Sequence, residues 1–182
     1  MPGTWSWEVA YRVPDSFRWS LHTHGDDQTL SFDGERSQQQ LGSVSLPPVA
    51  ADAGVRSQAR WFALTSLDVL LDPQVRWSEL GKSELPPGAS SGLVARFGDG
   101  PAYTLYFDAR DLLVRARGPI AMFPIGAGEL EASFSDYRDV EGYLLPFRGQ
   151  YRLDDRELMR EDVRAWKPDD PSLEGPSTFT VQ

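Results

Sequence analysis

The sequence predicts a mainly β domain of the α+β class, in which one long helix packs on the concave face of a strongly curved antiparallel sheet. Three observations support this architecture. Short segments with two-residue alternation fill both halves of the chain, turn-forming residues separate them, and one central segment has helical periodicity. A long sheet with one apolar face and a single helix buries both apolar surfaces when the sheet curves around the helix.

The first half of the chain is typical of an antiparallel meander. Residues 5–12 and 17–24 alternate apolar and polar side chains, with a turn between them. The segments Gln28–Phe32 and Arg36–Leu41 follow, and the dipeptide Asp33-Gly34 between them favours a tight hairpin. We expect this sheet to have one buried and one solvated face.

Residues 55–71 have the periodicity of a helix. Apolar side chains recur every three or four positions, for example at Val55, Phe62 and Val69, and Pro73 ends the pattern. The apolar arc is too wide for a helix surrounded by solvent. We therefore expect this one long helix to lie against the sheet.

The second half returns to strand patterns, of which Tyr143–Leu153 is the most regular. Further strands are expected at 93–97, 103–107, 112–117, 129–134 and 157–166, with loops at 42–54 and 85–92 and a polar tail at 168–182. The chain then has about nine or ten strands, the upper end for an ordinary open sheet. Its length suits a single domain covering residues 1–182.

Composition excludes several classes of protein. The 182 residues include 18 Lys and Arg, 27 Asp and Glu, and no Cys, which gives a net charge of −9. An acidic chain does not attract nucleic acid through its overall charge, and no apolar run is long enough to span a membrane. Without cysteine there is no disulfide, no thiolate nucleophile and no thiolate metal ligand.

The histidines are the only residues with the spacing of metal ligands. His22 and His24 share one face of a strand, and Asp26 follows closely. Because Trp19 and Leu21 occupy the opposite face, we interpret the histidines as part of a solvated face and expect no metal site.

The acidic residues gather where turns are expected. The clusters are Asp108 with Asp111; Asp136 with Asp139 and Glu141; and Asp154 with Asp155 and Glu157. Paired carboxylates can serve acid–base catalysis, but Asp also stabilises turns by bonding its own backbone. The common signatures of nucleophilic, phosphate-binding and dinucleotide-binding enzymes are absent from the sequence. We therefore expect neither catalytic residues nor a cofactor.

Aromatic residues are the most informative set, with 6 Trp, 9 Phe and 6 Tyr. They recur on the predicted inner faces, where they either fill a core or line an apolar pocket. The residues expected to line such a pocket are Phe17, Trp19, Leu21, Phe62, Leu105, Phe107, Phe134, Tyr143, Leu145, Phe147 and Tyr151.

Two stretches of the chain resemble a known family. Residues 11–19, Tyr-Arg-Val-Pro-Asp-Ser-Phe-Arg-Trp, with the Asp33-Gly34 hairpin after them, resemble the opening of LolA-type lipoprotein carriers. The run Tyr-Phe-Asp at 106–108 and the segment at 134–148, which begins Phe-Ser-Asp-Tyr-Arg, are similar to outer-membrane lipoprotein-sorting-like proteins. The resemblance covers most of the chain.

This resemblance implies an open half-barrel whose concave face is closed by helices and holds acyl chains. It implies a non-enzymatic binding or carrier protein for lipid, acyl chains or another hydrophobic ligand in the bacterial envelope, with an envelope protein as a further candidate partner. Two alternatives stay open: a cofactor-independent biosynthetic enzyme on the same fold, and an envelope lipoprotein that acts through protein contacts.

The first five residues lack the pattern of a signal peptide. The protein is then either cytoplasmic, or its export signal has been removed. We expect the second, with a location in the periplasm or at the outer membrane.

Overall fold

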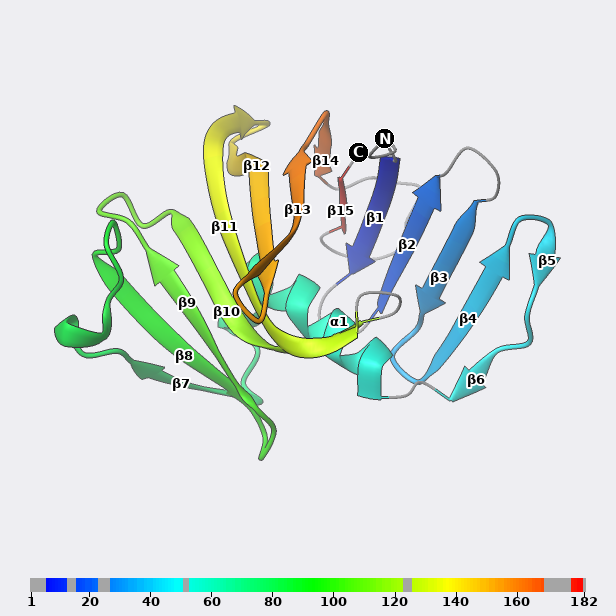
Figure 1. The fold of residues 1–182 in the computed structure, drawn as a ribbon, viewed down its shortest axis with the longest axis horizontal. Helices are drawn as coiled ribbons and strands as arrows, with labels where there is room; N and C mark the ends of the chain where they lie inside the picture. The colour runs from blue at the N-terminus through cyan, green and yellow to red at the C-terminus, as the bar shows by residue number, and fades with distance from the viewer. Residues whose placement is uncertain are drawn as a thin grey trace.

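Two antiparallel sheets and one α-helix make up the part of the chain that the computed structural model describes, residues 6–12, 16–22, 27–50, 53–122, 126–168 and 178–181 (Figure 1). The predicted mainly β class with a single α-helix is confirmed for these residues. Two sheets take the place of the one continuous sheet that the sequence predicts, and neither closes or curls strongly in the described ranges.

The first sheet has eight strands and is built from both ends of the described chain. Its path runs β14-β15-β1-β2-β3-β4-β5, and β6 also pairs with β4. The strands are β1 (Ser6–Arg12), β2 (Ser16–His22), β3 (Gln28–Phe32), β4 (Arg36–Leu41), β5 (Val44–Ser45), β6 (Val49–Ala50), β14 (Trp166–Pro168) and β15 (Thr178–Val181). The predicted meander corresponds to β1–β4, whose hairpins bring each strand beside its predecessor.

The second sheet has seven strands in their order along the chain. Its path is β13-β12-β11-β10-β9-β8-β7, and every neighbouring pair is antiparallel. The strands are β7 (Val75–Glu79), β8 (Ser91–Phe97), β9 (Ala102–Phe107), β10 (Leu113–Met122), β11 (Gly126–Val140), β12 (Tyr143–Leu153) and β13 (Arg156–Asp162). Alternation is clearest in β9, where Tyr103, Leu105 and Phe107 are buried and the residues between them are not.

The helix α1 (Ala53–Thr65) lies between the two sheets (Figure 1). Trp61 and Leu64 are buried against the second sheet, whereas Ala59 is buried against the first. Phe62 packs against both groups of residues. The wide apolar arc that the sequence predicts is therefore divided between two surfaces.

The larger apolar cluster belongs to the second sheet, α1 and the turn after it. Its most deeply buried side chains are Leu64, Val69, Ala95, Tyr103, Leu105, Ala116 and Ala132. This cluster is closely packed: a Cβ placed on Gly118 would lie 2.3 Å from the ring of Tyr103. Glycine at this position lets the β10 backbone approach the buried tyrosine.

The smaller apolar cluster brings the two sheets together. Its buried residues are Val9, Phe17, Leu30, Phe32 and Ala59. Leu145 of β12 and Trp166 of β14 also pack against this cluster, and the indole N–H of Trp166 donates a hydrogen bond of 2.8 Å to the carbonyl of Pro146. The sheets therefore meet where β14 lies beside β11 and β12.

The helix is shorter than the predicted segment 55–71. It ends at Thr65, and a 3₁₀ turn, η1 (Asp68–Leu71), follows Leu67, which has a left-handed φ of 65°. The hydroxyl of Thr65 donates to the carbonyl of Trp61 at 3.0 Å, and that of Ser66 donates to Ala63 at 2.9 Å. Such bonds compete with regular helix continuation, which favours an end at Thr65 although the apolar periodicity of the sequence continues.

Several strands differ from the predicted boundaries. β7 was not expected, β5 and β6 lie in the predicted loop 42–54, and β8 begins inside the predicted loop 85–92. The predicted strand 157–166 is divided into β13 and β14, and part of the polar tail forms β15, which pairs with β1. These short strands are stabilised by backbone pairing, so their side-chain patterns are weak.

Candidate ligand-binding face

The surface of the second sheet that faces α1 is defined here as the inner face. At its centre, side chains such as Leu105 (0% exposed) are completely buried. Toward β11 and β12 the large apolar residues are only partly buried, although they lie on the same face: Phe134, Leu145, Phe147 and Tyr151. Packing is therefore complete at the middle of the sheet and incomplete over β11 and β12.

Aromatic contacts order this part of the inner face. The rings of Phe134 and Tyr151 meet edge-on, with centroids 6.4 Å apart. The guanidinium of Arg138 lies 4.3 Å from the centroid of the Phe147 ring, and Arg138 also forms a 2.6 Å ion pair with Asp136. This hydrogen bond from Arg138 lowers the pKa of the Asp136 carboxyl. Phe147 is thus covered by a cation on one side of its ring.

The first sheet and α1 contribute apolar side chains beside β12. The ring of Phe17 contacts Phe62 edge-on at 5.3 Å and Phe32 at 5.8 Å. Trp19 is partly buried in the same cluster, which Leu145 of β12 also contacts. Side chains from both sheets and the helix therefore converge next to the incompletely packed region.

One acidic side chain lies on the inner face. Glu161 of β13 is the cross-strand partner of Gly149, so the two residues share a face with Tyr151. The hydroxyl of Tyr151 donates to the Glu161 carboxylate at 2.8 Å. The pKa of Glu161 is raised to about 7, chiefly by burial; the Tyr151 bond lowers this pKa, and the charge of Asp162 next to it raises it. Sequence reasoning did not identify this residue.

Gly149 leaves the space that this polar pair occupies. A Cβ at position 149 would lie 2.9 Å from the Tyr151 ring and 3.0 Å from a Glu161 carboxylate oxygen. The absence of a side chain at Gly149 lets Tyr151 and Glu161 meet above the backbone.

The outer face of the second sheet is polar. Ion pairs join neighbouring strands there: Arg115 with Glu131 at 3.8 Å, Arg117 with Glu129, and Arg148 with Asp162 at 3.4 Å. The side chains of the Arg117–Glu129 and Arg148–Asp162 pairs are about half or more exposed, so these two pairs contribute little to stability. The contrast identifies the opposite side as the apolar surface of this sheet.

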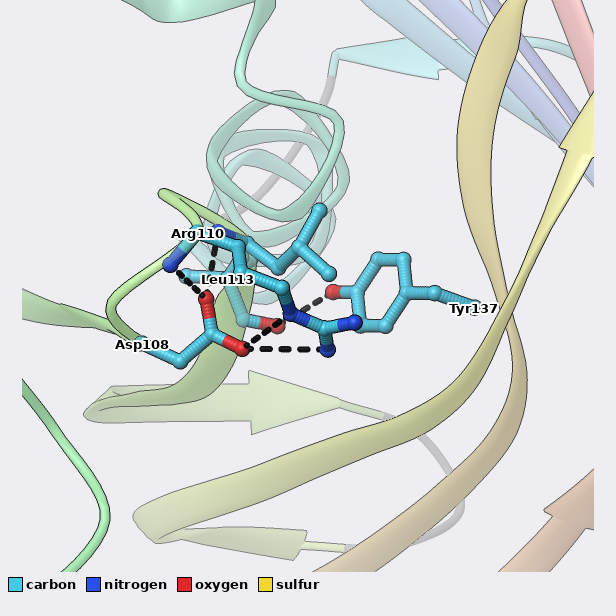
Figure 2. A network of polar contacts seen from close by, with 5 residues as sticks. Asp108, Arg110, Leu113 and Tyr137 are labelled. Atoms are coloured by element: carbon cyan, nitrogen blue, oxygen red, sulfur yellow. Dashed lines mark hydrogen bonds and ion pairs between the residues drawn. The ribbon is translucent and has the colours of Figure 1, made fainter.

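The acidic cluster near Asp108 forms a turn, as its sequence interpretation predicts. One carboxylate oxygen of Asp108 accepts the backbone N–H groups of Arg110 and Leu112, at 2.8 and 3.0 Å, and the other accepts the Arg110 guanidinium at 3.2 Å (Figure 2). The hydrogen bond from Leu112 is the main cause that lowers the Asp108 pKa. Beside this turn, the Tyr137 hydroxyl donates to the Leu113 carbonyl, and burial raises the pKa of that tyrosine.

The histidines do not form a metal centre among the described residues. The Nδ1 of His22 lies 3.2 Å from an Asp27 carboxylate oxygen, and both side chains are substantially exposed. His24 and Asp26 lie outside the described residues. Within the described ranges, no group of three or more His, Cys, Asp or Glu side chains is placed to hold a metal ion.

No family model, curated protein or solved structure matches the chain. None of the helices in the described ranges is long and apolar enough to cross a membrane.

The predicted lining residues fall into three groups. Four are buried in the cores, namely Phe17, Leu21, Leu105 and Phe107, and Tyr143 is exposed (44%) at the start of β12. The other six are partly buried: Trp19, Phe62, Phe134, Leu145, Phe147 and Tyr151. Only this last group has apolar surface that is both oriented inward and incompletely covered.

Proposed function

We propose that this chain is a non-enzymatic binding or carrier protein for lipid, acyl chains or another hydrophobic ligand in the bacterial envelope. The observation that supports this most is the incomplete packing of large apolar side chains on the inner face over β11 and β12. Partly exposed apolar surface that is gathered on one face, rather than scattered, is typical of a binding surface. Covering it with an acyl chain would contribute on the order of 25 cal/mol per Å² buried.

The position of α1 supports the same function. Phe62 contacts both apolar clusters and the ring of Phe17, and Leu145 from the other sheet packs against the cluster that includes Ala59 of the helix. A small shift of this helix would exchange contacts between side chains for contacts with a ligand. In this proposal α1 controls access to the inner face.

We also propose that the fold is related to the LolA-like half-barrel. The two sheets flank α1 as the two sides of a divided half-barrel, and β12 and β14 join them through the Trp166–Pro146 hydrogen bond (Figure 1). This relationship rests on the sequence resemblance and on the helix between the sheets. Under this proposal the protein acts in the periplasm or at the outer membrane.

The test is titration of the protein with a fluorescent fatty acid, in wild type and in Phe147→Ala. Phe147 is on the inner face and partly buried, so its removal should weaken binding about tenfold, which equals about 1.4 kcal/mol. Stability in urea should fall by about 1–2 kcal/mol, below the 3–5 kcal/mol typical of a fully packed phenylalanine.

Arg148→Ala is the matched control, because Arg148 is the next residue and lies on the outer face with Asp162. It should change neither probe binding nor stability by more than about 0.5 kcal/mol. If the wild type binds no apolar probe and Phe147→Ala costs more than about 3 kcal/mol, the inner face is a solid core and the proposal is wrong.

A further inference from the structure

The carboxylates of β13 are paired in two different ways. Glu157 contacts Arg160 at 2.9 Å, and Asp162 contacts Arg148 at 3.4 Å, so both have a cationic partner. Glu161 accepts the Tyr151 hydroxyl, and no Lys or Arg of the described ranges forms an ion pair with it. Of these three acidic residues, Glu161 lies on the apolar inner face, and it is the one without a cationic partner.

A carboxylate in apolar surroundings is costly unless a cation or several hydrogen bonds compensate its lost hydration. The surroundings of Glu161 offer little compensation. Among the described residues, Tyr151 of β12 is the titratable group that bonds to it, Phe134 of β11 presents only its ring to Tyr151, and Asp162 adds a like charge next in the chain. The raised pKa of Glu161, about 7, agrees with this geometry.

We propose that Glu161 and Tyr151 bind the headgroup of the ligand, and that this headgroup is an amine carried by an apolar chain. The inference rests on the proposed function, since it takes the adjoining inner face as the site of the apolar chain. An ammonium group beside Glu161 supplies the cation that the other β13 carboxylates already have. Charge-assisted hydrogen bonds of this type are about twice as strong as neutral ones.

The same site disfavours an anionic headgroup. A ligand carboxylate on the inner face would meet the Glu161 carboxylate, in a chain whose net charge is −9. Its approach would require Glu161 to keep its proton. Among amphiphiles of equal chain length, the amine should therefore bind with the highest affinity, the alcohol with a lower affinity and the carboxylate with the lowest.

The experiment compares dodecylamine, dodecanol and dodecanoate by isothermal titration calorimetry, each below its micelle concentration and at physiological salt. At about pH 8, where Glu161 is ionised, wild type should bind dodecylamine about tenfold more tightly than dodecanol. Glu161→Gln keeps an acceptor for Tyr151 but removes the charge, so this preference should disappear while dodecanol affinity stays within about twofold. Tyr151→Phe should weaken the preference by a smaller factor.

Two controls separate this site from general attraction to an acidic protein. Glu157→Gln removes one charge from the outer side of the same strand and should leave the amine preference intact. Lowering the pH from about 8 to about 5.5 should reduce the preference in wild type but not in Glu161→Gln, because protonation removes the Glu161 charge.

Each outcome decides a different point. The headgroup assignment would be overturned if wild type bound the amine and the alcohol equally well. It would also be overturned if Glu161→Gln and Glu157→Gln changed the amine preference equally. In either case the apolar face would still be shown to bind an apolar chain. If none of the three amphiphiles binds, the proposed function fails and this inference fails with it.

Discussion

Glu161 links the stability of the fold to pH. Its pKa rises from the ordinary value of 4.5 to about 7 in the folded protein, chiefly because of burial. The folded state therefore retains this proton over a range in which the unfolded chain loses it. The contribution of this proton to the unfolding free energy is about 1–3 kcal/mol. It is fully present below about pH 4.5 and is lost as the pH rises toward about 7.

Urea unfolding of wild type and Glu161→Gln across this pH range checks the prediction. The stability of wild type relative to the variant should fall as the pH rises from about 4.5 to about 7 and then stay constant. Carboxyls with lowered pKa values, such as Asp33 and Asp108, make the protein more stable as the pH rises, and they do so at lower pH. Both proteins contain these carboxyls, so their effect cancels when the stability of the variant is subtracted from that of wild type. A flat difference over the range would contradict a buried, protonated Glu161.

Some residues of the candidate site could be predicted from the sequence, and others could not. Phe134, Phe147 and Tyr151 were predicted to be inward because β11 and β12 alternate regularly. Glu161 was not, because β13 has the sequence Arg-Glu-Leu-Met-Arg-Glu-Asp and shows no apolar row. Its orientation follows from pairing with Gly149, and a register between strands cannot be read from one strand alone.

Among the elements, the β12–β13 hairpin offers a direct test of turn chemistry. Asp154 and Asp155 have φ values of 47° and 64°, and the guanidinium of Arg152 donates to the Asp155 carbonyl at 2.6 Å. Two consecutive positive φ values favour glycine at the second position. Asp155→Gly should therefore raise the unfolding free energy by about 0.5–1 kcal/mol.

Asp155→Ala is the comparison for that hairpin. Alanine has the Cβ that the left-handed region disfavours and has no polar group to bond the local backbone. In thermal melts, the melting temperature of the Gly variant should be above that of wild type, and that of the Ala variant below it. Equal melting temperatures for the Gly and Ala variants would show that the backbone conformation of this turn is not the cause.

Elements were predictable where side-chain patterns determine them. The meander β1–β4 and the strand β12 follow from alternation and from the Asp33-Gly34 turn. The end of α1 was not predictable, because Leu67 and Val69 keep the helical spacing while the backbone changes to a left-handed residue and a 3₁₀ turn. β15 was missed because it pairs with β1 through its backbone and lies in a polar tail.

For the whole molecule, Trp166 contributes a hydrogen bond and apolar packing to the contact between the sheets. Its indole N–H donates to Pro146 across the junction of β14 and β12. Trp166→Phe keeps an aromatic ring but leaves the carbonyl without this donor, so it should cost about 1 kcal/mol. Amide exchange should accelerate first in β14 and β15.

Trp77→Phe is the matched control for this substitution. The Trp77 indole nitrogen is buried and has no hydrogen-bond partner among the described residues. Removing an unsatisfied donor should leave stability unchanged or raise it slightly. If Trp77→Phe destabilises as much as Trp166→Phe, loss of aromatic volume rather than the Trp166–Pro146 bond explains both effects.

The order of strands has a consequence for how the chain folds during synthesis. Strands β7 to β13 pair only with their neighbours along the chain, so the second sheet can assemble as each hairpin leaves the ribosome. The first sheet cannot be completed in this way, because β1 pairs with β15, from the opposite end of the chain. The nascent protein must therefore carry one unpaired edge of β1 until β15 emerges. This edge is where a chaperone has reason to bind, and where two unfinished chains would aggregate.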